Sequence, residues 1–184
     1  MGYKVKFIEG KLIENISPVP CLKGTKIELE NLFFKISNRI DLFTDNKNIQ
    51  NIEDMLKSYI LQFLGIRFNF KINNKNQFNI IYDFPQKNEM SKQLFPYLSK
   101  INLESSRFQI DKNILVDCTF SIPDQSLNSE TLILFLSNRY VILPEYIKFV
   151  KNTYKAAMNG INKILNGFFV YMSIEINSDC IDFN

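Results

Sequence analysis

Leu132-Ile133-Leu134-Phe135-Leu136-Ser137-Asn138-Arg139-Tyr140-Val141 is the stretch that decides the fold. Its first five residues are apolar, which is typical of a β-strand buried on both faces. Ser137 and Asn138 then interrupt the apolar run, so a turn is expected at the end of the strand, with Arg139 in it. The stretch therefore predicts a strand buried on both faces that leads into a polar, basic turn.

Helix and strand patterns continue on both sides of this stretch. Pro144 is well placed in the first turn of a helix, and apolar residues from Ile147 to Leu165 recur at helical spacing. Residues 168–176 alternate as a last strand. Upstream, we expect a short helix at 89–98 and strands at about 108–111 and 114–122.

The first 85 residues contain a helix and two hairpin patterns. Apolar residues between Ile49 and Phe63 share one helical face, and alternating residues on both sides of 73–76 predict a hairpin. A strand at the N-terminus leads to a turn at Glu9-Gly10. The chain is thus predicted to be α+β, with mixed sheets packed against helices, in two pieces that meet near residue 85.

A second distinctive stretch runs from Gly24 to Phe34, with Arg39 beyond it. Thr25, Ile27 and Leu29 alternate with charged residues, as in a half-buried strand. An apolar turn and a short helix follow. We expect this turn to lie in the core; its apolar residues are Leu32, Phe33 and Phe34.

The order GT-x-I-x-L-x-x-LFF-x(4)-R resembles the hallmark segment of MutL-type DNA mismatch repair proteins. Residues 134–141 resemble the family's strand and turn with an NR-x-V element, which a helix with a tyrosine follows, here Tyr154. Residues 173–184 resemble the strand and loop before the family's VHPxK sequence. The three segments occur in the family's order, and the eukaryotic MutL homologue 1 branch is the most similar.

The resemblance implies a division into two domains. Residues 1–85 would be the C-terminal part of a GHKL-type ATPase domain, and 86–184 a transducer domain without its final lysine loop. That transducer has the fold of the ribosomal small-subunit protein five type. The family is a DNA-activated ATPase, regulated by ATP and magnesium, that acts as a clamp on DNA.

Several nucleotide-binding motifs of that family do not occur in the chain. There is no helix with the catalytic glutamate and magnesium-binding asparagine, no D-x-G-x-G loop and no GFRGEAL-type lid. We therefore expect no catalytic residue, no metal site and no ATP binding by this chain alone. It is interpreted as a fragment of a repair ATPase; the alternative is a degenerate, non-enzymatic remnant that acts as a protein-interaction module.

Three residues of the first piece have both a functional and a structural interpretation. The resemblance puts Gly24 and Thr25 at the ATP pocket, whereas a turn glycine and a strand-forming threonine explain them equally. The guanidinium of Arg39 could bind a carboxylate or a phosphate, or could hold the short helix by a structural ion pair.

The candidate DNA contacts lie in the second piece. In the family a basic residue at the position of Arg139 lines the groove thought to hold DNA, and Asn138 is beside it. An arginine fixed in a turn suits sequence-independent phosphate contact. Lysines that could extend this patch recur at helical spacing, although such a stripe is also typical of a solvated helix face; they are Lys148, Lys151 and Lys155.

Composition limits the other function classes. The chain has no histidine, which excludes Ser/His/Asp and Cys/His catalysis, and its three cysteines form no CxxC unit. A net charge of +3 permits nucleic-acid contact without requiring it. We see no signal peptide and no apolar run long enough for a membrane. The resemblance implies the nucleus, DNA, a second MutL-type subunit in a heterodimer and a MutS-type mismatch-recognition protein.

Overall fold

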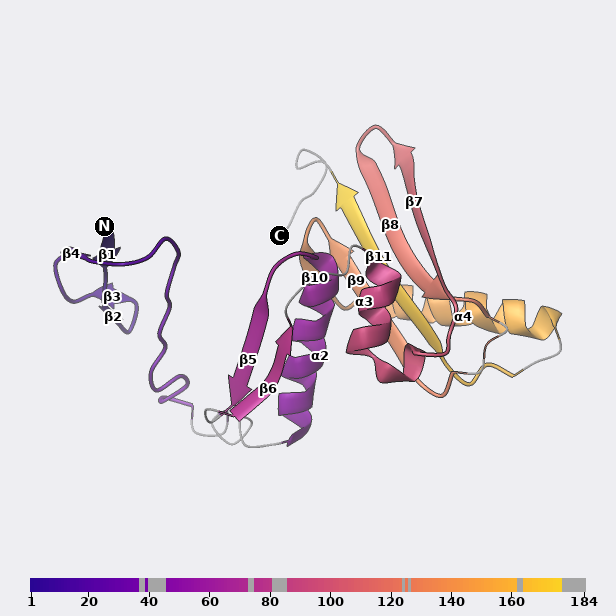
Figure 1. The fold of residues 1–184 in the computed structure, drawn as a ribbon, viewed down its shortest axis with the longest axis horizontal. Coiled ribbons are helices and arrows are strands. Elements are labelled where there is room, and N and C mark those ends of the chain that lie inside the picture. The colour runs from indigo at the N-terminus through magenta and orange to yellow at the C-terminus, as the bar shows by residue number, and fades with distance from the viewer. Residues whose placement is uncertain are drawn as a thin grey trace. The chain divides into compact units, whose positions relative to one another are not determined.

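The computed structural model describes residues 1–36, 39, 46–72, 75–80, 86–123, 125, 127–161 and 164–176. They belong to two compact units, Met1–Asp45 and Asn46–Asn184. Figure 1 shows the helices and strands of both units along the chain.

A five-stranded mixed sheet forms the centre of the second unit (Figure 1). Its strand order is β10-β9-β11-β8-β7, and every neighbouring pair is antiparallel except β9 and β11, which are parallel. The middle strand is therefore β11, the last in sequence. The strands are β7 (Leu103–Asp111), β8 (Ile114–Ser121), β9 (Glu130–Leu136), β10 (Arg139–Val141) and β11 (Phe168–Ile176).

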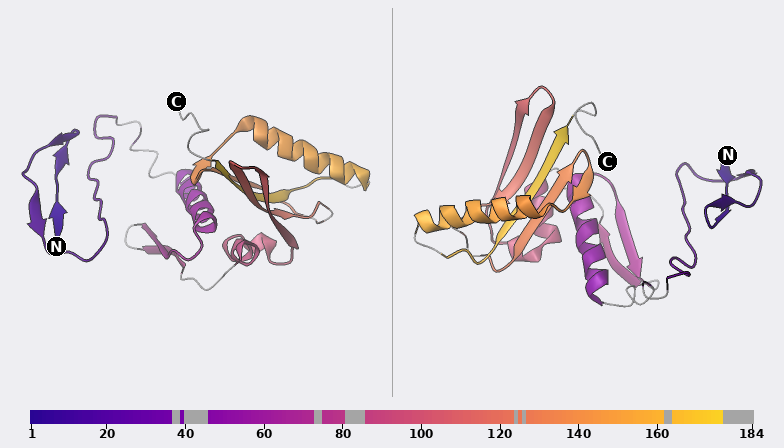
Figure 2. Two further views of the ribbon diagram at one scale, coloured as in Figure 1. Left: turned by 90° about the horizontal axis from the view of Figure 1, so that it is seen from above. Right: turned by 180° about the vertical axis from the view of Figure 1, so that it is seen from behind.

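Helices cover both faces of this sheet (Figure 2). One face packs against α2 (Asn46–Gln62), α3 (Lys87–Leu94) and the 3₁₀ turn η2 (Pro96–Leu98). The other face packs against α4 (Pro144–Gly160), whose proline occupies the first turn as expected.

The alternation of side chains along β11 explains the two cores. Phe169 and Tyr171 point to the face that packs against α2 and α3, and Phe168 and Val170 point to the face of α4. All four side chains are buried. On β9, Leu134 and Phe135 are almost completely buried too, which confirms a strand covered on both faces.

A two-stranded hairpin completes the described part of the second unit. β5 (Phe68–Ile72) pairs in antiparallel fashion with β6 (Lys75–Ile80), and Phe68 packs against the core that α2 and α3 form. The hairpin, the helices and the strands expected in this half of the chain are thus confirmed, as is the α+β class with a mixed sheet.

The units divide the chain at a different place from the expected boundary near residue 85. Their division lies at Asp45/Asn46, because Ile60 and Leu61 of α2 are fully buried in one core with Met90, Leu94 and the sheet. Helix α2 therefore belongs with the residues that follow it.

The first unit consists of two small antiparallel pairs. β1 (Gly2–Lys4) pairs with β4 (Ser17–Val19), and β2 (Phe7–Ile8) pairs with β3 (Lys11–Leu12). Glu9 and Gly10 join the second pair with φ angles of 51° and 78°, which confirms the expected turn.

The strand expected at Gly24–Glu30 was a wrong prediction. Residues 21–30 are described as neither helix nor strand, and every one of them is exposed. A strand needs a neighbour for its backbone groups and for its apolar face. No described strand of this unit lies beside the segment, so its alternating pattern has nothing to pair with.

The side chains of the apolar turn after this segment are not buried in a core either. Leu32 is 49% exposed, Phe34 is 60% exposed and Phe33 is half-buried, contrary to the expectation. The same is true of the whole unit, since none of its described residues is buried.

Candidate nucleic-acid interface

The turn between β9 and β10 presents the candidate residues Asn138 and Arg139. Ser137 and Asn138 have φ angles of 44° and 67°, and they join Leu136 to Arg139, which pair across the hairpin. Two central residues with positive φ match the twist of the flanking strands, and asparagine tolerates this conformation well. The turn is therefore a tight two-residue connection, which limits where its side chains can point.

Ser137 attaches the turn to the end of β11. Its backbone N–H donates to Ile174 O over 2.9 Å, and its hydroxyl donates to Ile176 O over 3.2 Å. The N–H of Ile176 also lies 3.4 Å from Ser137 Oγ, which accepts from it. One side of the turn is thus held by three hydrogen bonds to the central strand.

Gln62, the last residue of α2, holds the other side of the turn. Its Nε2 donates to Asn138 Oδ1 over 2.7 Å. Its Oε1 accepts the hydroxyl proton of Tyr171 over 2.6 Å. A helix end, the central strand and the turn are therefore joined by one glutamine side chain.

Lys87 and Asp117 complete this polar network. Lys87 Nζ donates to Tyr171 Oη and to Asp117 Oδ2, both over 2.7 Å, and lies 4.3 Å from the centre of the Tyr171 ring. Tyr171 is fully buried, and this burial, followed by the charge of Asp117, raises the pKa of its hydroxyl. Tyr171 thus keeps its proton at neutral pH and can donate it to Gln62.

Asn138 and Arg139 are both exposed. The turn follows the last residue of β9, Leu136, which is paired with Ile174 of β11. Strand β8 begins at this same end of the sheet, where Ile114 is paired with Ile176 of β11. The turn between β7 and β8 lies at this end of the sheet too, and its Lys112 is exposed. Lys112 is therefore a further polar side chain at the same end of the strands as Asn138 and Arg139.

Of the three lysines of α4, Lys151 lies away from Arg139. Lys148 and Lys155 are exposed, and Lys151 forms an ion pair of 2.7 Å with Glu130 at the opposite end of β9. From Glu130 to Leu136 a strand extends about 20 Å. Lys151 is therefore separate from the turn group (Asn138 and Arg139), and the three lysines of α4 are called the helix group (Lys148, Lys151 and Lys155).

The residues proposed for the ATP pocket lie in the first unit. Gly24 has a φ of 146°, which favours glycine, and Thr25 is exposed in the segment that forms no strand. The Arg39 guanidinium lies 5.3 Å from the centre of the Phe33 ring, and its backbone N–H donates to Ile36 O over 2.9 Å. These contacts hold Arg39 against the apolar turn of the same unit.

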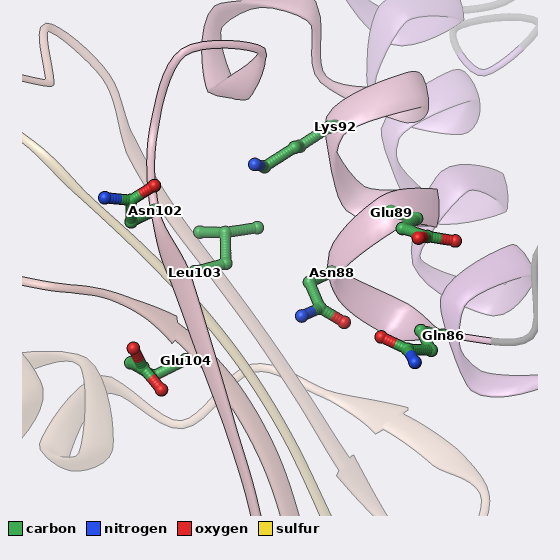
Figure 3. Close-up of a pocket in the computed structure, with 7 residues that line it drawn as sticks. All are labelled: Gln86, Asn88, Glu89, Lys92, Asn102, Leu103 and Glu104. Carbon is green, nitrogen blue, oxygen red and sulfur yellow. The ribbon is translucent and has the colours of Figure 1, made fainter.

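A shallow hollow of about 350 Å³ lies between α3 and the start of β7 (Figure 3). Its lining mixes Lys92 with Glu89 and Glu104, so it does not favour one sign of ligand charge. Within the described residues no group of three histidine, cysteine or acidic side chains is placed to hold a metal. Nor does any helix there have the length and apolarity needed to cross a bilayer.

Sequence reasoning missed the network behind the turn. Gln62 is a lone amide in the apolar run Ile60–Leu64, and this is the one local signal that could have drawn attention to it. Nothing in the sequence pattern links it to Lys87, Asp117 or Tyr171. The segment 177–184, which resembles the loop before the family's lysine motif, lies outside the described residues.

The chain was compared with known proteins. No family model matches it. Over its whole length it is 26% identical, across 198 aligned residues, to the DNA mismatch repair protein MLH1 of Saccharomyces cerevisiae. The match covers 24% of that protein, so the chain spans about a quarter of the length of this curated relative.

Proposed function

We propose that this chain is part of a MutL-type DNA mismatch repair protein and that it contacts DNA through the β9–β10 turn. Similarity to a mismatch repair protein along the entire chain supports the family. The observation that carries the DNA contact is the turn itself, in which Arg139 follows Ser137, held by β11, and Asn138, held by Gln62.

The contact we propose is with phosphate rather than with base edges. An arginine fork and an amide donor on a fixed turn can bind a backbone phosphate, and such contacts give affinity without sequence preference. The helix group would supply a second contact. Because Lys151 of this group pairs with Glu130, about 20 Å along β9 from the turn group, one duplex could touch both over roughly six base pairs.

The rest of the proposal follows from the family. The chain would contribute the transducer, with its ribosomal small-subunit protein five type of fold, and the end of a GHKL ATPase domain that includes Gly24 and Thr25. The whole protein would be an ATP-regulated clamp in the nucleus that binds ATP and magnesium, which this chain alone would not bind. Its partners would be a second MutL-type subunit and a MutS-type protein.

A second candidate function is that of a non-enzymatic interaction module derived from the same family. The exposed apolar side chains of the first unit favour it, because Ile27, Leu29 and Phe34 are each more than half exposed. This candidate predicts protein partners but no salt-dependent DNA binding.

The two candidates differ in one measurement, the affinity for a duplex of about 20 base pairs at several salt concentrations. If the proposal holds, Arg139→Glu weakens binding at least tenfold and reduces the dependence on salt. Lys100→Glu is the matched control, because it makes the same charge change beyond η2, before β7 and away from the turn. Equal affinities for Arg139→Glu and Lys100→Glu would exclude the turn, and no salt-dependent binding by any form would favour the interaction module.

A further inference from the structure

The hydrogen bonds behind the β9–β10 turn all run in one direction. A lysine ammonium has three donors and no acceptor, so Lys87 must donate to Tyr171 Oη. With a lone pair of the hydroxyl so occupied, its single proton goes to Gln62 Oε1. Gln62 then turns its Nε2 toward Asn138 and donates to Oδ1.

The last step of this chain fixes the side-chain amide of Asn138. Because Oδ1 faces Gln62, the Nδ2 group faces away from the network. Asn138 is exposed, and its Nδ2 has no acceptor among the described residues. The turn therefore presents N–H donors next to the guanidinium of Arg139.

We infer that Lys87 and Gln62 are positioning residues that keep Asn138 oriented as a hydrogen-bond donor to a phosphate oxygen. The inference rests on the proposed function, which it extends from Arg139 to the network behind it. Lys87 acts through two intervening side chains and does not itself contact the ligand.

Reversing the chain has a cost only while Lys87 is present. If Gln62 turned its amide around, Tyr171 would receive hydrogen bonds from both Lys87 and Gln62, and its proton would lose the Gln62 acceptor. Tyr171 is fully buried, so water cannot replace that acceptor. Without Lys87, the Tyr171 hydroxyl makes one hydrogen bond to Gln62 whichever way the amide is turned, so Gln62 and Asn138 are then free to turn their carbonyl oxygens outward.

The test compares Lys87→Met with Lys87→Arg, since arginine is also a donor without an acceptor. Lys92→Met, on the same helix, is the control for the lost charge. The first readout needs no DNA: solvent exchange of the side-chain amide protons, measured by nuclear magnetic resonance. In the natural chain and in Lys87→Arg, the Gln62 protons should exchange slowly and the Asn138 protons fast, and Lys87→Met should remove or reverse this order.

The second readout is the affinity for the 20-base-pair duplex. Lys87→Met should weaken it about threefold to tenfold, the equivalent of one hydrogen bond, beyond any effect of Lys92→Met, and Lys87→Arg should restore it. A folded Lys87→Met protein with unchanged amide exchange and unchanged affinity would overturn the inference. If Lys87→Met does not fold, Gln62→Met gives the test at a different position: it removes the donor to Asn138 and should weaken DNA binding by a similar factor.

Failure of the inference can be told apart from failure of the proposed function. If the natural chain does not bind DNA, the proposed function is wrong, while the amide exchange still shows whether Lys87 orients Asn138. If the chain binds DNA through Arg139 but the Lys87 and Gln62 variants bind equally well, the function stands and the positioning role is wrong.

Discussion

The rings of Tyr59 and Phe135 meet edge to face, with centroids 5.3 Å apart and planes 79° apart. Tyr59 belongs to α2 and Phe135 to the strand buried on both faces. Aromatic pairs in this geometry are stabilised beyond the area they bury. The contact joins the helix that ends at Gln62 to the strand that leads into the Asn138 turn, so the core and the candidate interface share the same two elements.

Phe135→Ala should therefore destabilise the second unit strongly. Its side chain is fully buried, and truncating such a phenylalanine costs about 3–5 kcal/mol. The free energy of unfolding, measured in urea, checks this. Phe149→Ala is the matched control, because Phe149 is 67% exposed and should change stability by less than about 0.5 kcal/mol. Equal losses in the two variants would show that the core is placed wrongly.

Long periodic segments explain what could be predicted from the sequence. The apolar run before Ser137 and the helical spacing after Pro144 each carry their structure locally, and both were confirmed. The segment after Gly24 has an equally regular pattern but forms no strand, because alternation describes a face and does not supply a neighbouring strand.

The candidate interface could be predicted only in part. The turn was expected because polar residues interrupt an apolar run, and the family resemblance singled out Asn138 and Arg139 in it. Their supports were not expected, since Gln62 lies 76 positions from Asn138 and 109 from Tyr171 in the chain. Periodicity reports on neighbours within a helix or strand, whereas the direction of donation in the network depends on contacts between five separate elements.

Alkaline pH should destabilise the fold through Tyr146. Burial, followed by the charges of Cys118 and Tyr154, raises the pKa of its hydroxyl to about 12 from an ordinary 10.0. The unfolded chain therefore loses this proton first, so the stabilisation is complete below pH 10 and is lost as the pH rises toward 12. Urea unfolding at pH 9 and pH 11 should show the fall. In Tyr146→Phe the decline should be shallower, and an identical decline would mean that other groups cause it.

Neutralising Glu130 should strengthen DNA binding by the helix group. Glu130 pairs with Lys151 over 2.7 Å, with both side chains about two-fifths exposed, so the pair adds at most about 1 kcal/mol of stability. Glu130→Gln should release the Lys151 charge for phosphate and increase the salt dependence of binding. Glu104→Gln makes the same charge change on β7 and serves as the control. If both variants bind DNA alike, Lys151 is not a contact.

Residues 46–184 should fold without the first 45. None of the described residues of the first unit is buried, whereas the second unit contains both cores. A chain that begins at Asn46 should therefore unfold in urea with a midpoint close to that of the whole chain.

A chain that begins at Phe63 is the control, because it also lacks α2 and so uncovers the core that the fully buried Ile60 and Leu61 complete. That shorter chain should lose its cooperative transition. If it unfolds like the longer one, α2 is not part of the folded unit, and the division at Asp45/Asn46 is wrong.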